Sequence, residues 1–83
     1  MKVELKYFAS IREAVGQGAE SWQTQANTVG ALRDELMARG EPYAQVLARG
    51  RAVRMALNQA VCDETAALNE GCEVAFFPPV TGG

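Results

Sequence analysis

One stretch specifies how this chain is organised: Cys72-Glu73-Val74-Ala75-Phe76-Phe77-Pro78-Pro79-Val80-Thr81-Gly82-Gly83. Residues 72–77 are strand-forming and mostly apolar, and their alternation places Val74 and Phe76 on one face of a strand and Phe77 on the other. Pro78 and Pro79 stop the strand, because proline has no backbone N–H to donate to a ladder. The sequence therefore predicts a last strand that continues directly into an extended tail.

The tail has the composition of a segment that enters another protein. Residues 78–83 can extend about 20 Å, since an extended or polyproline chain advances roughly 3.1–3.3 Å per residue. Gly82 and Gly83 carry no side chain beside the terminal carboxylate, so a narrow tunnel could close around bare backbone. A glycine-rich end is also typical of a frayed terminus, but no polar linker separates this tail from the last strand. We interpret residues 1–77 as one domain and residues 78–83 as a functional tail.

Length and composition define the class of protein. The chain has 83 residues, 48% of them hydrophobic and 22% charged, which indicates one soluble globular domain with a small core. The formal net charge is −2, with acids and bases interspersed, which argues against nucleic acid as a partner. The chain has no apolar run of membrane-spanning length, and residues 1–6 alternate charged with apolar side chains. We therefore expect a cytoplasmic protein with no membrane partner.

The residues that usually perform chemistry are scarce. Cys62 and Cys72 are the two cysteines, too few for an iron–sulfur or zinc site built from thiolates. We expect both to be reduced thiols, with a disulfide as the alternative. Histidine is absent, which removes the commonest general base and metal ligand. The composition thus argues against a chain that is catalytic alone, and against a bound metal or cofactor.

The first part of the chain alternates and then turns. Residues 2–7 predict a half-buried strand with Val3, Leu5 and Tyr7 on its buried face, and Phe8 falls on the opposite, charged face. Ser10 and Glu13 fit a capping box for a short helix over about residues 10–15. Gly16 is suited to end that helix, and residues 19–25 predict a second strand.

The middle of the chain predicts the main helix. Asn27 or Thr28 is the expected N-cap, and Gly40 the expected C-terminal cap. Apolar side chains at helical spacing predict the buried face, and charged side chains predict the exposed one. The buried residues are Val29, Leu32 and Leu36, with Met37, and those expected to face away are Arg33, Asp34 and Arg39.

Short elements follow the main helix. Pro42 can begin a second short helix that extends toward Gly50. Residues 53–61 predict extended structure interrupted by a turn at Asn58-Gln59, and residues 68–71 predict the turn before the last strand.

This order of elements is that of an α+β, ubiquitin-like β-grasp fold: a mixed sheet with one main helix packed on one face and short extra helices. In that fold the first and last strands are neighbours. Phe8 and Phe77 are then expected together on the solvent face, joined by Val61, at the root of the tail. An exposed apolar cluster in that position is a candidate partner surface.

The whole chain resembles the small, sulfur-carrying subunit of molybdopterin synthase, a β-grasp sulfur carrier family. The most specific part of the resemblance is the C-terminal stretch from Gly71 to Gly83. Residues 8–16 look like that family's early strand and helix, and Asn58-Gln59 matches its mid-chain turn. Cys72 is a departure, because the family usually has an acidic residue there.

The resemblance implies a role for the C-terminal residue. The carboxylate of Gly83 would be adenylated by an ATP-using, ubiquitin-activating-like enzyme and converted by a sulfur-delivering protein to a thiocarboxylate. Gly83 would then donate its sulfur to cyclic pyranopterin monophosphate in the active site of the large synthase subunit. The family uses ATP in the activating enzyme, and the carrier itself binds no permanent cofactor.

The resemblance also implies how the carrier meets its partner. The residues that match the segment entering the large subunit are Pro78, Pro79, Val80, Thr81, Gly82 and Gly83, and those that match the subunit interface are Phe8, Val61 and Phe77. The expected assembly with the large subunit is a heterotetramer.

Other classes of function share the Gly-Gly end. A thiamine-type sulfur carrier is the nearest alternative, and the stretch from Phe76 to Thr81 argues against it. A ubiquitin-like modifier joined to lysines would also begin with adenylation. A plain interaction domain with an inert tail is the third alternative.

Overall fold

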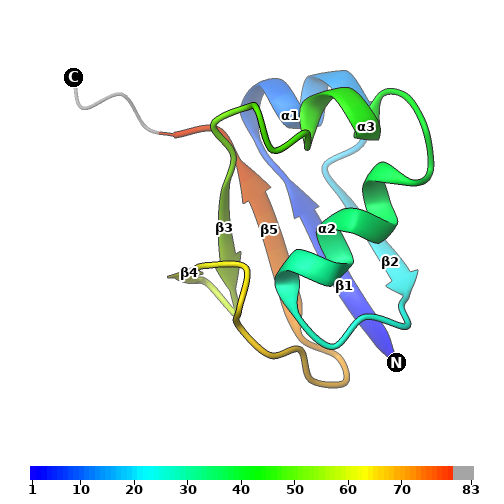
Figure 1. Cartoon of the computed structure of the whole chain (residues 1–83), viewed down its shortest axis with the longest axis vertical. Coiled ribbons are helices and arrows are strands. Elements are labelled where there is room, and N and C mark those ends of the chain that lie inside the picture. The colour runs from blue at the N-terminus through cyan, green and yellow to red at the C-terminus, as the bar shows by residue number, and fades with distance from the viewer. Residues whose placement is uncertain (80–83) are drawn as a thin grey trace.

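A five-stranded mixed sheet is the centre of the fold, and its helices lie in front of it in Figure 1. The computed structural model of the chain describes residues 1–79. The strands are β1 (Lys2–Tyr7), β2 (Ala19–Gln23), β3 (Arg54–Leu57), β4 (Ala60–Cys62) and β5 (Glu73–Phe77), in the order β2-β1-β5-β3-β4. β1 and β5 are parallel, whereas the other pairs are antiparallel. The first and last strands are therefore neighbours, as the sequence predicts.

The strands divide their side chains between two unlike faces. On the inner face Val3, Leu5, Val74 and Phe76 are fully buried, and Tyr7 nearly so.

β3 and β4 are joined by Asn58 and Gln59, which have φ of +49° and +71°. Positive φ at both central residues is the requirement of a type I′ hairpin turn, so the predicted turn is confirmed.

The helices are α1 (Ala9–Val15), α2 (Val29–Met37) and α3 (Tyr43–Val46). In Figure 1, α2 crosses the inner face of the sheet, and α1 and α3 lie at the end where β1 and β5 finish. Thr28 caps α2, because its hydroxyl accepts a hydrogen bond from the backbone N–H of Ala31 at 3.2 Å. The predicted apolar face of α2 is buried in the core, which confirms the β-grasp fold. None of the helices within residues 1–79 has the length and apolar character needed to cross a bilayer.

The predicted capping box of α1 is wrong. The helix begins at Ala9, its N-cap is Phe8, and no side chain caps it. Phe8 is held there by its own backbone, whose N–H donates to the carbonyl of Phe76 at 3.2 Å and whose carbonyl accepts from Ile11 and Arg12. A contact with the last strand thus fixes where the helix starts, and Ser10 lies inside the first turn. Gly16 ends the helix with φ +83°, as predicted.

Three other boundaries differ from the prediction. α3 ends at Val46 rather than extending toward Gly50. β2 stops at Gln23 rather than residue 25, because the hydroxyl of Thr24 accepts from the N–H of Ala26 and turns the chain. α2 ends at Met37, before the predicted cap at Gly40. Gly40 adopts φ +91° in the turn that follows, where its N–H donates to the carbonyl of Met37 at 3.1 Å.

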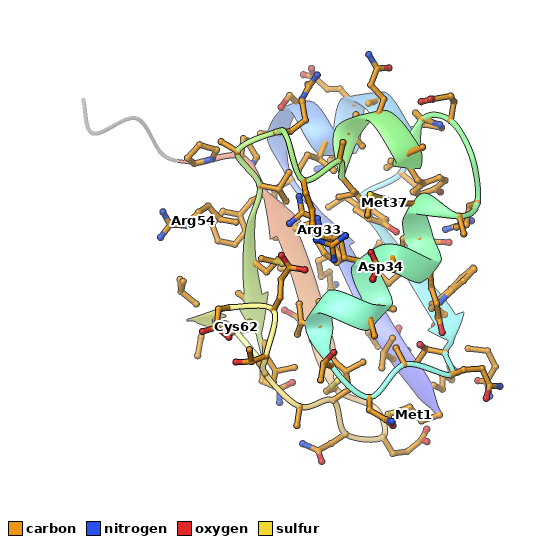
Figure 2. The ribbon with its side chains drawn as sticks, viewed as in Figure 1. Met1, Arg33, Asp34, Met37, Arg54 and Cys62 are labelled. Carbon is orange, nitrogen blue, oxygen red and sulfur yellow. The ribbon has the colours of Figure 1, made fainter. Side chains whose placement is uncertain are left out.

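Arg33 does not face away from the protein as predicted. Its side chain is 4% exposed, although its neighbour Asp34 on α2 is exposed (Figure 2 labels both). The guanidinium donates from Nε to the carbonyl of Leu47 at 2.6 Å and from Nη2 to that of Ala48 at 3.0 Å. Glu64 lies 3.5 Å from Nη1. Arg33 thereby connects α2 to the irregular chain after α3 by hydrogen bonds. The helical pattern of α2 could not predict these bonds, because their acceptors lie in a distant segment.

We expect Arg33→Met to lower the free energy of unfolding by about 1–3 kcal/mol, because it leaves the buried carbonyl of Leu47 without a donor. Urea denaturation at neutral pH measures the loss. The control is Arg12→Met at an exposed site, which should change stability by no more than about 0.5 kcal/mol. Equal effects of the two substitutions would contradict the role given to Arg33.

Candidate partner-docking site

An apolar groove of about 660 Å³ lies on the outer face of the sheet, on the side away from α2. The groove is lined by residues of α1, of three strands and of the start of the tail: Phe8, Ala9, Ala56, Gln59, Val61, Glu73, Ala75, Phe77, Pro78 and Pro79. The described residues with large, exposed hydrophobic side chains are Phe8 (49%) and Val61 (66%), and both line this groove. The outer face is therefore not a uniformly polar surface.

The register of the strands explains the shape of the groove. Ala56 of β3 is paired with Ala75 of β5 on one side and with Val61 of β4 on the other. Directly paired residues point to the same face of a sheet, so the two alanines form a shallow floor. They are only 8% and 6% exposed, although no helix covers them. Larger neighbours, above all Phe8 and Phe77, form the walls.

The groove continues into the tail. β5 ends at Phe77, and the next two residues, Pro78 and Pro79, also line the groove. Pro78 is half-buried and Pro79 is exposed, and in Figure 1 this segment leaves the end of β5 away from the body of the protein. We call residues 77–79 the tail root. A partner that fills the groove therefore also contacts the tail root.

The structure brings the sequence-predicted cluster together. Phe8, the N-cap of α1, lines one groove with Val61 of β4 and Phe77 of β5. Their role at a subunit interface stays a prediction. Val80, Thr81, Gly82 and Gly83 lie outside the described residues. Sequence reasoning missed the alanine floor, whose signal is a small residue at the outward position of each of two strands that pair.

Aromatic packing holds the strand ends beneath the tail root. Tyr7 and Phe76 are paired in the parallel ladder, and their rings stack with centroids 6.3 Å apart. The Tyr7 hydroxyl donates to Glu20 at 2.7 Å. Burial, with the hydrogen bond to Glu20, raises the pKa of Tyr7 far above its usual value, so it remains a neutral donor. The point from which the tail departs is thus fixed by the core.

The cysteines and acids form no second site. Cys62 and Cys72 are free, and Cys72 is buried at the entrance to β5. Burial, with the neighbouring Asp63, raises the pKa of the Cys62 thiol and disfavours its thiolate. Within residues 1–79, no group of three or more His, Cys, Asp or Glu side chains is placed to hold a metal ion.

Comparison with known proteins assigns the family. The model of a family described as the ThiS family matches residues 5–83. The chain belongs to the ThiS family. Two of its curated relatives cover nearly all of it. The molybdopterin synthase sulfur carrier subunit of Escherichia coli strain K12 is 40% identical over 81 residues, which is 98% of this chain and 99% of the relative. Small archaeal modifier protein 3 of Haloferax volcanii is 36% identical over 97 residues, covering 100% of both chains.

A solved structure shows a similar fold inside a complex. It is the complex of subunits 1 and 2 of the molybdopterin-converting factor from Helicobacter pylori. The match has a TM-score of 0.70 and 26% identity, and it covers 100% of both chains. This ThiS-family chain therefore shares its fold with a protein solved in contact with a second subunit.

The two faces of the sheet should respond differently to the same substitution. We expect Val61→Ser, at an exposed wall of the groove, to change the free energy of unfolding by no more than about 0.5 kcal/mol. Val74→Ser places a hydroxyl in the core and should cost about 2–4 kcal/mol. Thermal or urea denaturation of both variants measures the difference. Similar losses would contradict the assignment of Val61 to the open face.

Proposed function

We propose that this chain is the sulfur carrier subunit of molybdopterin synthase, acting in molybdenum cofactor biosynthesis. The observation that carries the proposal is the apolar groove that runs into the tail root and is lined by Phe8, Val61 and Phe77. Relatives at 36–40% identity that carry this name support it. A docking surface beside the start of an extended tail is what a protein needs if its chain end works inside a partner.

The proposed chemistry takes place at Gly83. The Gly83 carboxylate attacks the α-phosphate of ATP in an activating enzyme, which forms an acyl adenylate and releases pyrophosphate. A persulfide on a sulfur-delivering protein displaces AMP and forms an acyl disulfide. A thiol then cleaves the S–S bond, which releases the thiocarboxylate and leaves a disulfide on the donor side. That group donates its sulfur to cyclic pyranopterin monophosphate. None of these steps requires a general base on the carrier, which is consistent with a chain that has no histidine.

The proposed partner is the large synthase subunit, in a heterotetramer. The Helicobacter pylori complex of subunits 1 and 2 supports a two-subunit assembly. The groove supplies apolar area, and residues 78–83 enter the active site of the large subunit. In this proposal the carrier is not catalytic by itself, holds no permanent cofactor, and depends on ATP only through the activating enzyme.

The proposed setting is the cytoplasm. The two cysteines are free thiols, which fits a reducing compartment.

A second candidate function is supported by one relative. Small archaeal modifier protein 3 is 36% identical over its whole length, and a modifier would join the Gly83 carboxyl group to a lysine of another protein. Both functions begin with adenylation, so the product at the chain end distinguishes them. A thiocarboxylate indicates a carrier, and an isopeptide bond indicates a modifier.

Intact mass spectrometry of the chain from its own cells tests the proposal. We expect a species in which one oxygen is replaced by sulfur at the C-terminus, because the carrier is loaded before it meets the large subunit. Peptide mapping should place the sulfur on Gly83. Lysine-linked conjugates in quantity, without the sulfur-bearing species, would favour the modifier.

Adding one alanine after Gly83 should abolish sulfur transfer, because the reactive carboxylate would move beyond its place and carry a side chain beside it. The measurement is molybdopterin formation in a mixture of large subunit, activating enzyme, sulfur donor, ATP and cyclic pyranopterin monophosphate. The control is an unchanged melting temperature, which shows an intact domain. Product formation at the parent's rate would refute the role of the chain end.

Phe77→Glu should weaken binding to the large subunit by several kcal/mol, because a charge would be buried unpaired in an apolar interface. Isothermal titration calorimetry measures the affinity. The matched control is Gln23→Glu, which adds the same charge at an exposed position of the edge strand β2. An equal affinity for Phe77→Glu and the parent would rule out the groove as the docking site.

A further inference from the structure

The arginines of this chain fall into two groups. Within residues 1–79, Arg33, Arg39 and Arg49 each form an ion pair with an acidic side chain of the same protein. Arg12, Arg51 and Arg54 take part in none of the ion pairs of that part of the chain, and all three are exposed. Arg12 lines neither cavity that Pro78 lines. Arg51 and Arg54 are close in sequence, and both lie beside the tail root.

Arg54 lies on the groove side of the tail root. It is the first residue of β3 and is paired in register with Phe77, the last residue of β5. Paired residues of neighbouring strands point to the same face, so Arg54 stands beside Phe77 on the outer face. Figure 2 shows its side chain projecting away from the body of the protein.

Arg51 lies on the other side. It lines a second, smaller cavity of about 290 Å³ formed with α1 and with the chain around α3. Ser10 and Gln45 add polar groups to this cavity, and none of the described residues that line it is acidic. Pro78 lines both this cavity and the apolar groove. The tail root therefore emerges between a cavity lined by Arg51 and a groove wall beside Arg54.

We propose that Arg51 and Arg54 form a cationic collar that recognises acidic side chains around the opening of the partner site into which the tail is inserted. This inference rests on the proposed function, and it adds to that function a prediction that the partner surface around the opening is acidic. The whole chain has a net charge of −2, so its overall field does not favour an acidic partner. A local pair of cations at the tail root orients the encounter and speeds association.

The position of the collar indicates that its two arginines contact the surface of the partner and do not reach the reacting group at the chain end. Residues 78–83 span up to about 20 Å when extended, which is farther than an arginine side chain reaches. Charges at that separation are also screened at physiological ionic strength, where the Debye length is about 8 Å. The collar therefore meets the rim of the partner, and the chemistry at the chain end lies beyond it.

Association kinetics with the large synthase subunit test the collar. The variant Arg51→Gln/Arg54→Gln removes both cations, and Lys2→Glu changes the net charge by the same amount at an exposed site on β1. At low salt we expect the double variant to associate roughly tenfold more slowly than the parent and Lys2→Glu within about twofold of it. The difference should shrink as salt is raised to roughly 0.5 M.

The outcomes separate this inference from the proposed function. If the parent binds the large subunit with an association rate that is insensitive to salt, or if Lys2→Glu slows association as much as the double variant, the collar is overturned alone. If the parent does not bind at all, the proposed function fails and the collar with it. Each single variant, expected to slow association about threefold, keeps the test available if the double variant unfolds.

Discussion

The parallel pairing of β1 with β5 is the constraint on which the other features of this fold depend. A parallel pair needs a crossover between its strands, and here the connection is all the chain between Tyr7 and Glu73. The pairing sets Tyr7 beside Phe76 and lets the N–H of Phe8 donate to Phe76. The turn after the first strand and the end of the last strand therefore meet at one point. The tail leaves from the centre of the sheet, with neighbours on both sides.

The two faces of the sheet differ in what covers them. The helices pack against the inner face and its end, so the large apolar side chains there are buried in the core or packed against it. The outer face lacks the cover of α2, yet three successive strands place Ala75, Ala56 and Val61 in one row there, with Lys6 next to Ala75 on β1. An exposed apolar patch rimmed by polar residues is typical of an interaction surface. The groove is thus explained by a partner more readily than by the stability of the isolated domain.

Sequence reasoning succeeds here where the cause is local. The alternation of β1, the cap at Thr28 and the turn at Asn58-Gln59 depend on neighbouring residues, and all three could be predicted. Sequence reasoning fails where contacts with distant segments determine the local structure. The start of α1 is set by the carbonyl of Phe76, and the burial of Arg33 by carbonyls after α3. The groove could be predicted only in part. The strand order is enough to place Phe8 and Phe77 together, whereas the alanine floor is recognised only once the register of the strands is known.

The proposed function places docking and chemistry in different parts of this chain. The groove offers apolar area for binding, and the stacked Tyr7 and Phe76 fix the ends of β1 and β5 from which the tail root continues. Pro78 and Pro79 restrict the backbone where the tail begins, which lowers the entropy lost when a partner orders it. In the proposed function, the chain end needs no catalytic side chain nearby. On that proposal, affinity can be changed at the groove without altering the chain end, and the chain end can carry oxygen or sulfur without altering the groove.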